Sequence, residues 1–514
     1  MKKTDLKKLS VLLLVVITMI FSGCSINTVS LKTVTLDDVI KNVNTKNAQK
    51  LKSISTYDEA DFLIDVNSES FTDEELKAMS SSGYENVTKA EAKEDVETLF
   101  RFLKSSYAGY TYFGGDEAFG KAEKEIKSNI DSFSKNKLNQ EELAGVIMQS
   151  LGFVKDSHFL MLGKQAFEEA HTYYESEKRE FKMTEDNRYC TEIDDAFWYL
   201  PAETEKYMKL TIGESGELVY GMFAVVTDEE KEDLPTSVQL ENGDKKEEIK
   251  LDWIISEVGG DQSAQAKFSE ENGVAISSLA DMTASESSIG EINNFLNDSK
   301  KLAGYDNSIL DLRENDGGLA EIDMFWIYGY TGKIADISNT VYTFKDDKFE
   351  RIEKLNGVLR PTEPLDTFDI VKENSELMDV CTNLENEFDD FQGVRKANGV
   401  LNCKPDKIIS NPNTLFVLQS KHNYSAGEVF LMMLDNVENV VSVGTNTNGC
   451  VHFGNVFPLA LPNSKTTFTF SISILTGFDK DFDVYGLEPD IYIADDDAQE
   501  AVLKCIEYYS KDKS

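Results

Sequence analysis

Cysteine, histidine and basic residues are all scarce in this sequence, and each shortage excludes a class of protein or site. The 514 residues include six cysteines, and none of them stands in CxxC spacing, which excludes a disulfide scaffold and a cysteine-based zinc motif. The 52 basic residues face 92 acidic ones, a net charge of −40, and such a surface repels nucleic acid. The chain has only four histidines, so a site that needs an imidazole has few residues to draw on.

A long apolar run is also absent. The run 11–21 near the N-terminus is about eleven residues long, whereas a bilayer span needs roughly 20. Lysines precede this run, and Ser22-Gly23-Cys24 follows it, which resembles the lipobox of bacterial lipoproteins. The resemblance implies a signal peptide over 1–23, lipidation of Cys24 and a membrane-anchored protein on the extracellular face of the cell membrane. An ordinary secretory signal is the alternative.

After residue 23 the sequence is first polar, and apolar residues then recur at helical spacing. Residues 24–55 are rich in lysine, asparagine and threonine, which predicts a flexible tether. Thr88 begins a capping-box pattern that is followed by apolar residues on one helical face. Further helices are expected over 118–133 and after Asn139. We therefore expect an N-terminal helical domain over 56–184.

Strand patterns dominate the rest of the chain. Residues 185–300 predict a β-rich segment, with strands over 218–226 and 247–255. From 301 to 514, short apolar strands alternate with helical patterns, which favours an α/β core. No internal repeat is visible.

Four sequence landmarks in this last region occur in a fixed order. They are the strand 309–313 with Gly317-Gly318, the strand 415–418 with Ser425-Ala426-Gly427-Glu428, Val443-Gly444 with a glycine loop, and Gly486-Leu487-Glu488-Pro489-Asp490-Ile491. Their order and spacing resemble the tail-specific (C-terminal-processing) serine peptidases over most of residues 85–495. The resemblance implies a crotonase/ClpP-like α/β core, a polypeptide substrate, no cofactor and no metal.

Ser425 is the expected nucleophile. A serine hydroxyl needs a base within hydrogen-bond reach, and a position before a helix directs backbone N–H groups at the reacting carbonyl. The amide of Ala426 and one from Gly317 or Gly318 are expected to form the oxyanion hole. The alternative is that Ser425 is only a helix N-cap.

The resemblance also indicates the base. One branch of the family uses a lysine from the glycine loop, but Cys450 occupies that position here. The tricorn-core branch instead uses a histidine preceded by a serine, and Ser157-His158 matches that pattern after the helical region. Asp483 is the expected acid that orients the histidine, and Glu488 is the competing candidate.

The function expected from these residues is a cell-surface lipoprotein serine peptidase that acts through an acyl-enzyme. The alternative is an inactive peptide-binding lipoprotein on the same fold, which the missing lysine favours. A carbohydrate-binding role has no aromatic cluster to support it. Tail-specific peptidases often carry a PDZ module in the middle interval, and a degenerate PDZ-like module or an unrelated β-rich segment both fit residues 185–300. The sequence gives no indication of oligomeric state.

Overall fold

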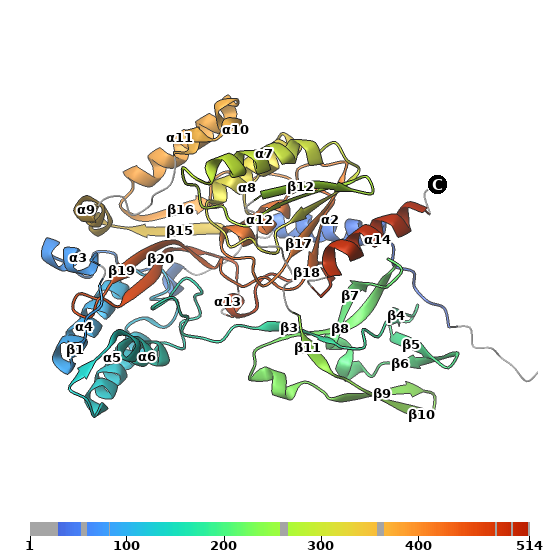
Figure 1. Cartoon of the computed structure of the whole chain (residues 1–514), viewed down its shortest axis with the longest axis horizontal. Helices are drawn as coiled ribbons and strands as arrows, with labels where there is room; N and C mark the ends of the chain where they lie inside the picture. The colour runs from blue at the N-terminus through green and yellow to red at the C-terminus, as the bar shows by residue number, and fades with distance from the viewer. Residues whose placement is uncertain are drawn as a thin grey trace, which may run out of the picture.

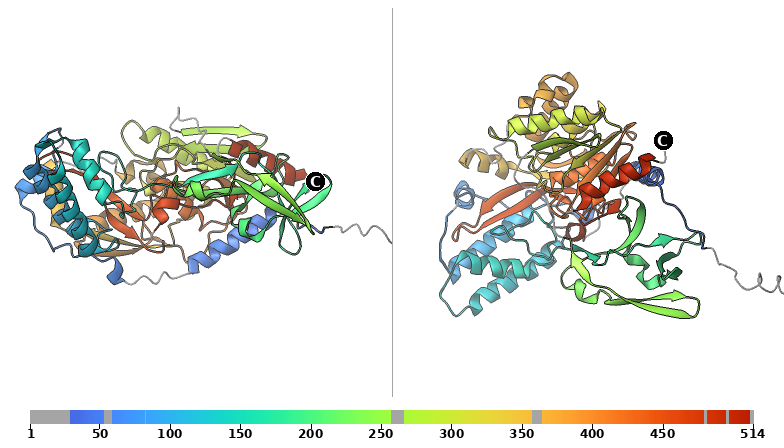
Figure 2. Two further views of the ribbon diagram at one scale, coloured as in Figure 1. Left: turned by 90° about the horizontal axis from the view of Figure 1, so that it is seen from below. Right: turned by 45° about the vertical axis from the view of Figure 1, so that its right-hand side comes forward.

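The computed structural model describes residues 29–52, 59–81, 83–256, 266–356, 364–478, 481–494 and 497–511. The signal region and Cys24 therefore lie outside the described residues. A central α/β core carries a group of helices at one end and a β-rich lobe at the other (Figures 1 and 2). This arrangement confirms the expected mixed fold class, with N-terminal helices and a β-rich middle segment.

The core contains a six-stranded sheet in the order β12-β13-β14-β17-β18-β21, in which all pairs except β12–β13 are parallel. Apolar side chains of β14 and β17 are fully buried on both faces, as expected for parallel strands that are covered on both sides. Helices α7, α8 and α12 cover one face, and α2 and α14 cover the other. These elements are α2 Leu36–Lys52, β12 Ala266–Glu271, β13 Val274–Leu279, α7 Ile289–Leu302, β14 Asn307–Asp311, α8 Ala320–Thr331, β17 Thr414–Gln419, α12 Ala426–Leu434, β18 Val440–Gly444, α13 Phe482–Tyr485, β21 Ile491–Tyr492 and α14 Ala498–Lys511.

Two expected boundaries are wrong here. The core begins at 266 and not at 301, because β12 and β13 extend its sheet and α7 covers it. The tether expected over 24–55 is also too long, since residues 36–52 form helix α2. Val39 and Val43 are buried against the core sheet, and burial of an amphipathic face stabilises a helix whose sequence alone looks polar.

A second sheet joins the core to the N-terminal helices. Its order is β16-β15-β20-β19, and one hydrophobic cluster includes residues of α4, α5, α6, β19 and β20. The capping box expected at Thr88 is confirmed, and the helix expected after Asn139 begins at Gln140. The elements are η1 Glu59–Asp61, α3 Asp73–Met79, β1 Val87–Thr88, α4 Lys89–Ser106, α5 Gly115–Ser132, β2 Lys137–Leu138, α6 Gln140–Ser150, β15 Thr340–Lys345, α9 Asp347–Asn356, η4 Leu365–Thr367, α10 Asp369–Lys372, α11 Ser375–Asp390, β16 Gly393–Asn398, β19 Phe453–Ala460 and β20 Thr467–Leu475.

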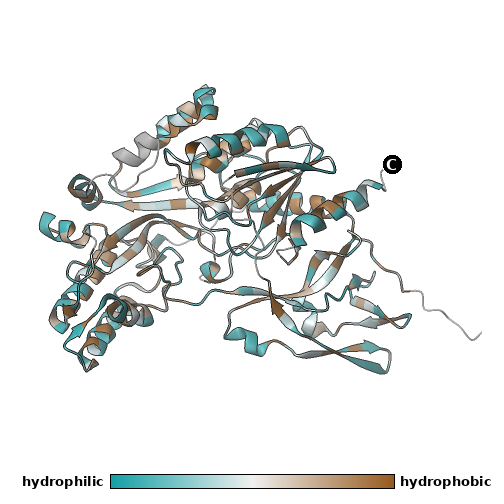
Figure 3. Cartoon of the chain, in the orientation of Figure 1, coloured by the Kyte–Doolittle hydropathy of each residue, from teal (hydrophilic) through white to brown (hydrophobic). Residues whose placement is uncertain are grey.

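The β-rich lobe consists of two sheets, β10-β9-β6-β5-β4 and β11-β3-β8-β7. It begins with β3 at His171, so the helical region expected to reach 184 ends earlier. Figure 3 shows that hydrophobic residues are less concentrated in this lobe than in the central strands. Its elements are β3 His171–Glu175, β4 Lys182–Met183, β5 Tyr189–Ile193, β6 Ala196–Tyr199, η2 Ala202–Tyr207, β7 Met208–Ile212, β8 Leu218–Val226, η3 Glu230–Asp233, β9 Ser237–Asn242, β10 Lys245–Lys250 and β11 Trp253–Ile255.

Within the described ranges, none of the helices is both long and apolar enough to cross a bilayer. Four of the five cysteines of these ranges are buried.

Candidate active site

Ser425 lies where the chain passes from β17 to α12. The strand is held between β14 and β18, and every residue of α12 is buried. Ser425 has φ 48° and ψ −114°, and its side chain makes no capping hydrogen bond. The N-cap alternative therefore receives no support. A non-glycine residue at positive φ is a strained conformation of the kind that gathers at functional sites.

His158 faces this hydroxyl from the turn that follows α6. The distance from His158 Nε2 to Ser425 Oγ is 3.1 Å, which is within hydrogen-bond reach. The turn is fixed from two sides: Asp156 Oδ1 accepts from the His158 N–H at 2.8 Å, and Thr469 Oγ1 of β20 donates to the His158 carbonyl at 2.5 Å. The shared core of α6 and β20 thus sets the position of the histidine.

The electrostatics keep this histidine neutral. Burial lowers the pKa of His158 to about 4, although the backbone of Phe453 acts in the opposite direction. Its Nδ1 is buried and has no side-chain partner among the described residues. A neutral imidazole can accept the serine proton.

Asp483 lies in this site but holds the backbone and not the imidazole. Its Oδ2 accepts from the Ser157 N–H at 3.2 Å, and its Oδ1 accepts from the His452 N–H at 3.3 Å. Burial and the neighbouring Asp156 raise the pKa of Asp483 well above its usual range. In the part of the chain that the structure describes, no carboxylate bonds to His158 Nδ1.

The other two expected acid–base residues lie differently. Ser157 Oγ donates to the Gly449 carbonyl at 2.9 Å, so Ser157 joins the histidine turn to the loop after β18. Glu488 is 63% exposed in its side chain and pairs with Lys209 at 3.5 Å. It therefore points away from the buried groups around His158.

The glycine turn after β14 lies directly against the nucleophile. A Cβ on Gly317 would stand 2.7 Å from the Tyr424 carbonyl and 3.1 Å from the Ala426 nitrogen. The Gly317 N–H already donates to Asn315 Oδ1 at 3.0 Å. In the described segments, the N–H groups of Gly318 and Ala426 donate to no protein acceptor, which leaves both available to an oxyanion.

Two landmark residues, Asp311 and Arg313, form an ion pair with a closest distance of 2.7 Å. This pair sits at the end of β14, just before the glycine turn, and fixes the end of the strand relative to that turn.

The structural role of Glu428 was not predicted from the sequence. This buried residue of α12 accepts from Thr447 Oγ1 at 2.5 Å, from the Gly449 N–H at 3.0 Å and from the Cys450 N–H at 2.6 Å. Burial raises the pKa of Glu428 to about 7. Glu428 stands three residues after Ser425 and is the one acidic residue of the otherwise apolar helix α12, and this feature of the sequence could have indicated its role.

Cys450 and His452, which follow Gly449, are both buried. Cys450 is 4% exposed, and burial followed by the charge of Glu428 raises the pKa of its thiol well above the usual range. His452 packs among aromatic rings such as Tyr112 and Phe453, and burial lowers its pKa to about 3. No group of His, Cys, Asp and Glu side chains that could hold a metal ion occurs within the described ranges.

Comparison with known proteins relates part of the chain to a peptidase family. Residues 274–493 match the model of peptidase family S41. No curated protein matches the sequence. The matched segment contains β13 to β21 and therefore Ser425, the glycine turn and Asp483, while His158 lies before it.

Solved structures resemble the chain at low identity. The structure of mature CPAF complexed with lactacystin has 14% identity, covers 83% of this chain and 98% of its own, and has a TM-score of 0.44. A lipoprotein from Streptococcus agalactiae has 10% identity, covers 82% and 97%, and has a TM-score of 0.37. The photosystem II D1 C-terminal processing protease has 11% identity, covers 78% and 92%, and has a TM-score of 0.32.

The segment that resembles peptidase family S41, residues 274–493, therefore carries the serine, the glycine turn and Asp483 of the candidate site.

Proposed function

We propose that this protein hydrolyses polypeptides through an acyl-enzyme on Ser425, with His158 as general base. The observation that carries the proposal is the 3.1 Å contact between His158 Nε2 and Ser425 Oγ, made between residues 267 positions apart. A serine hydroxyl with no capping partner and a neutral imidazole beside it is the arrangement that nucleophilic acyl transfer requires.

The geometry supports the following sequence of steps. Ser425 Oγ attacks the substrate carbonyl while its proton moves to His158 Nε2. The N–H groups of Ala426 and Gly318 stabilise the oxyanion. The protonated histidine gives its proton to the leaving amine. His158 then takes a proton from a water molecule, which attacks the acyl-enzyme and releases the acyl group from Ser425.

The proposed dyad is of the serine–histidine type. Cys450 occupies the position at which the serine–lysine branch has its base, and a buried thiol with a raised pKa is protonated at neutral pH. His158 reaches the nucleophile from outside the segment that matches the family model. The basic group is thus supplied by the N-terminal helical region.

We further propose that the protein is a lipoprotein anchored through Cys24 on the extracellular face of the cell membrane. The support is the sequence Ser22-Gly23-Cys24 after a short apolar run. Replacement of Cys24 by serine should move the protein from the membrane fraction to the soluble fraction, and an unchanged distribution would contradict the anchor.

The catalytic proposal is tested with a fluorophosphonate probe on the folded protein. Wild-type protein should be labelled at one site, and Ser425→Ala should remove the label. His158→Ala should slow labelling by about 10²-fold or more, since a positioned general base contributes roughly 10²–10⁴. His422→Ala is the matched histidine control and should label at the wild-type rate.

One observation favours the second candidate, an inactive peptide-binding lipoprotein. His158 Nδ1 has no carboxylate partner in the described residues, so the imidazolium that forms during attack lacks the usual stabilising charge. Absence of labelling, together with binding of unfolded peptides, would support this candidate and contradict the peptidase proposal.

A further inference from the structure

The first described residues of the chain are paired with a hairpin of the β-rich lobe. Leu31 forms an antiparallel bridge with Thr184, in the turn between β4 and β5. The Lys32 N–H donates to the Met183 carbonyl at 2.8 Å, and a second main-chain bond of 3.0 Å joins Ser30 to the same turn. Main-chain hydrogen bonds thus hold this segment on the lobe.

Helix α14 contacts the same segment. The Tyr509 hydroxyl donates to the Val34 carbonyl at 2.9 Å, so the segment is held between the lobe and the C-terminal end of α14. The ring of Tyr508 lies 5.0 Å from that of Tyr509, and Tyr508 is 39% exposed. We refer to the surface formed by residues 30–34, the hairpin 182–188 and Tyr508 as the anchor face.

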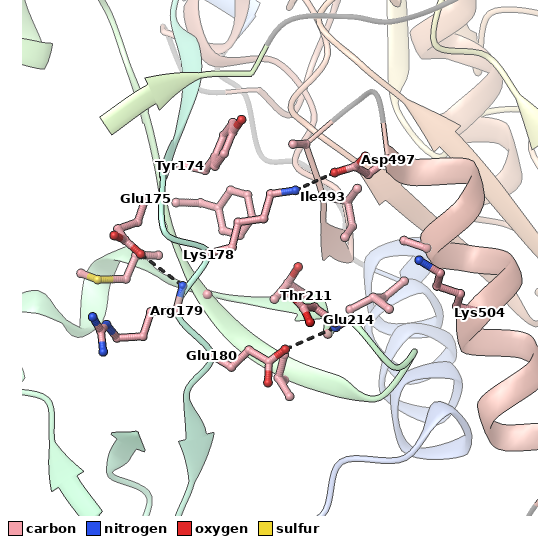
Figure 4. Close-up of a pocket in the computed structure, with 18 of the residues that line it drawn as sticks. Tyr174, Glu175, Lys178, Arg179, Glu180, Thr211, Glu214, Ile493, Asp497 and Lys504 are labelled. Carbon is pink, nitrogen blue, oxygen red and sulfur yellow. Dashed lines mark hydrogen bonds and ion pairs between the residues drawn. The ribbon is translucent and has the colours of Figure 1, made fainter. Parts of the chain in front are cut away.

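The anchor face has a fixed place on the core. Residues of α2, β7, β8 and α14 share one hydrophobic cluster. The β7–β8 turn rests on α14 so closely that a Cβ on Gly216 would overlap the Lys504 carbonyl. Figure 4 shows the ion pair of 2.6 Å between Lys178 of the lobe and Asp497, which precedes α14. A movement of the anchor face relative to the core would break this packing.

The linker between the proposed lipidation site and the anchor face is short. Cys24 stands six residues before Ser30. An extended chain spans at most ~3.5 Å per residue, so a lipid on Cys24 lies within about 21 Å of Ser30. A compact chain of about 490 residues has a radius of gyration of about 23 Å. Since the linker is no longer than this radius, the surface near residue 30 is the one brought to the membrane.

The N-terminal helices lie at the other end of the molecule. Figures 1 and 2 show α4, α5 and α6 at the end opposite to the one where the described chain begins. The linker is too short for these helices to reach a bilayer that holds Cys24.

The charge of the anchor face suits a membrane surface. Residues 24–36 contain one lysine and no acidic residue. The hairpin 182–188 carries two basic and two acidic side chains, which are Lys182, Arg188, Glu185 and Asp186. The face is therefore close to neutral in a chain of net charge −40, so an anionic bilayer repels it less than it repels the average surface of the chain.

An exposed aromatic ring points to the same surface. Tyr508 is one of a few large hydrophobic residues that are exposed among the described residues. Tyrosine is enriched where proteins meet the membrane–water interface, because its ring is apolar and its hydroxyl is polar.

We propose that the anchor face lies against the outer surface of the lipid bilayer, with α4, α5 and α6 directed away from it. This inference rests on the proposed lipid anchor at Cys24 and adds a fixed orientation to it. The helical group that supplies His158 is then held away from the bilayer.

The test is photocross-linking of the full-length, lipidated protein in vesicles of equal parts of phosphatidylglycerol and phosphatidylcholine. The photoreactive residue is introduced as Tyr508→p-benzoylphenylalanine on the anchor face. The matched control is Tyr84→p-benzoylphenylalanine, since Tyr84 is also exposed and stands shortly before α4. Position 508 should cross-link to phospholipid about fivefold or more above position 84, which the linker keeps out of reach. Equal cross-linking at the two positions overturns the orientation.

A second pair of variants tests the hydrogen bonds that hold residues 30–32. Lys32→Pro removes the N–H that donates to Met183, whereas Lys32→Ala keeps this N–H and removes the same charge. Because proline has no N–H, Lys32→Pro should lower lipid cross-linking from position 508 about threefold or more, and Lys32→Ala should leave it unchanged. Thermal unfolding checks that both variants are folded. Equal effects of the two substitutions contradict the part played by these bonds.

Sedimentation with the vesicles separates this proposal from the lipid anchor. Protein that sediments with the vesicles but cross-links equally at positions 508 and 84 overturns the orientation and leaves the anchor in place. Wild-type protein that sediments no better than Cys24→Ser overturns both proposals.

Discussion

Asp156 holds the backbone of His158, with its Oδ1 2.8 Å from the histidine N–H. Its Oδ2 accepts from Tyr107 at 2.9 Å, so a single buried carboxylate joins the end of α4 to the histidine turn. The imidazole is thus positioned through its main chain, by a residue two positions away that is supported by the helical region.

Replacement of Asp156 tests this support. Asp156→Ala leaves the His158 N–H and the Tyr107 hydroxyl without acceptors. Each such buried group lowers the free energy of unfolding by about 1–3 kcal/mol. We expect a clear drop in melting temperature and at least tenfold slower fluorophosphonate labelling. Asp156→Asn keeps an acceptor for the His158 N–H and should label within about threefold of wild type. Equal effects of the two substitutions would show that the hydrogen bond does not matter.

The labelling rate should depend on pH through His158. Burial lowers the pKa of His158 to about 4, and only the neutral ring accepts a proton, so the rate should rise through pH 4 and be constant from about 5 to 6.5. A midpoint near 6.5, the ordinary histidine value, would contradict this account. The stability of the fold depends on the protonation of His158 as well. The contribution of the neutral, buried ring to the free energy of unfolding is fully present above pH 6.5 and is lost as the pH falls through about 4.

Glu428 should affect stability in the opposite sense. Burial raises its pKa to about 7, above its usual value, so its contribution to stability is present at low pH and is lost as the pH rises through about 7. Glu428→Gln should therefore flatten the fall in melting temperature between pH 5 and 8. Glu428→Ala should lower stability at all pH values, because Thr447, Gly449 and Cys450 lose their acceptor.

The oxyanion turn should not tolerate a side chain. Gly318 has φ 134°, and a Cβ there would stand 2.2 Å from the Met282 carbonyl carbon. We expect Gly318→Ala to reduce turnover about 10²–10³-fold, the effect of losing an oxyanion donor. Gly332→Ala is the control, since Gly332 has φ 69° with nothing within 4 Å of its Cβ position. Similar losses in both variants would attribute the effect to backbone strain alone.

The Cys450 thiol should be inert. It is 4% exposed, and its pKa is raised by burial and by Glu428, whereas only a thiolate reacts readily. Iodoacetamide at pH 7 should leave Ser425 labelling unchanged, and Cys450→Ser should retain activity within about threefold. Rapid inactivation by iodoacetamide that Cys450→Ser prevents would assign the thiol a direct role.

The sequence by itself determined the buried strands of the core and the glycine turn that follows one of them. Apolar strands such as 415–418 and the Gly317-Gly318 turn carry local signals, because burial on both faces and a positive φ each restrict the residue types that fit. The order of the landmarks also placed Ser425 before a helix. The capping pattern at Thr88 also indicated a helix start from the sequence alone, since a cap is a contact between near neighbours.

Only the tertiary structure decided which groups meet. No local pattern shows that Asp483 bonds the Ser157 amide and that His158 Nδ1 has no carboxylate partner among the described residues. Nor does a local pattern show that Glu488 pairs with Lys209. Helix α2 and the start of the core at β12 were missed because their stability comes from burial against distant strands. The contact between His158 and Ser425 depends on the packing of α6 and β20 in one hydrophobic cluster, which is a property of the assembled chain.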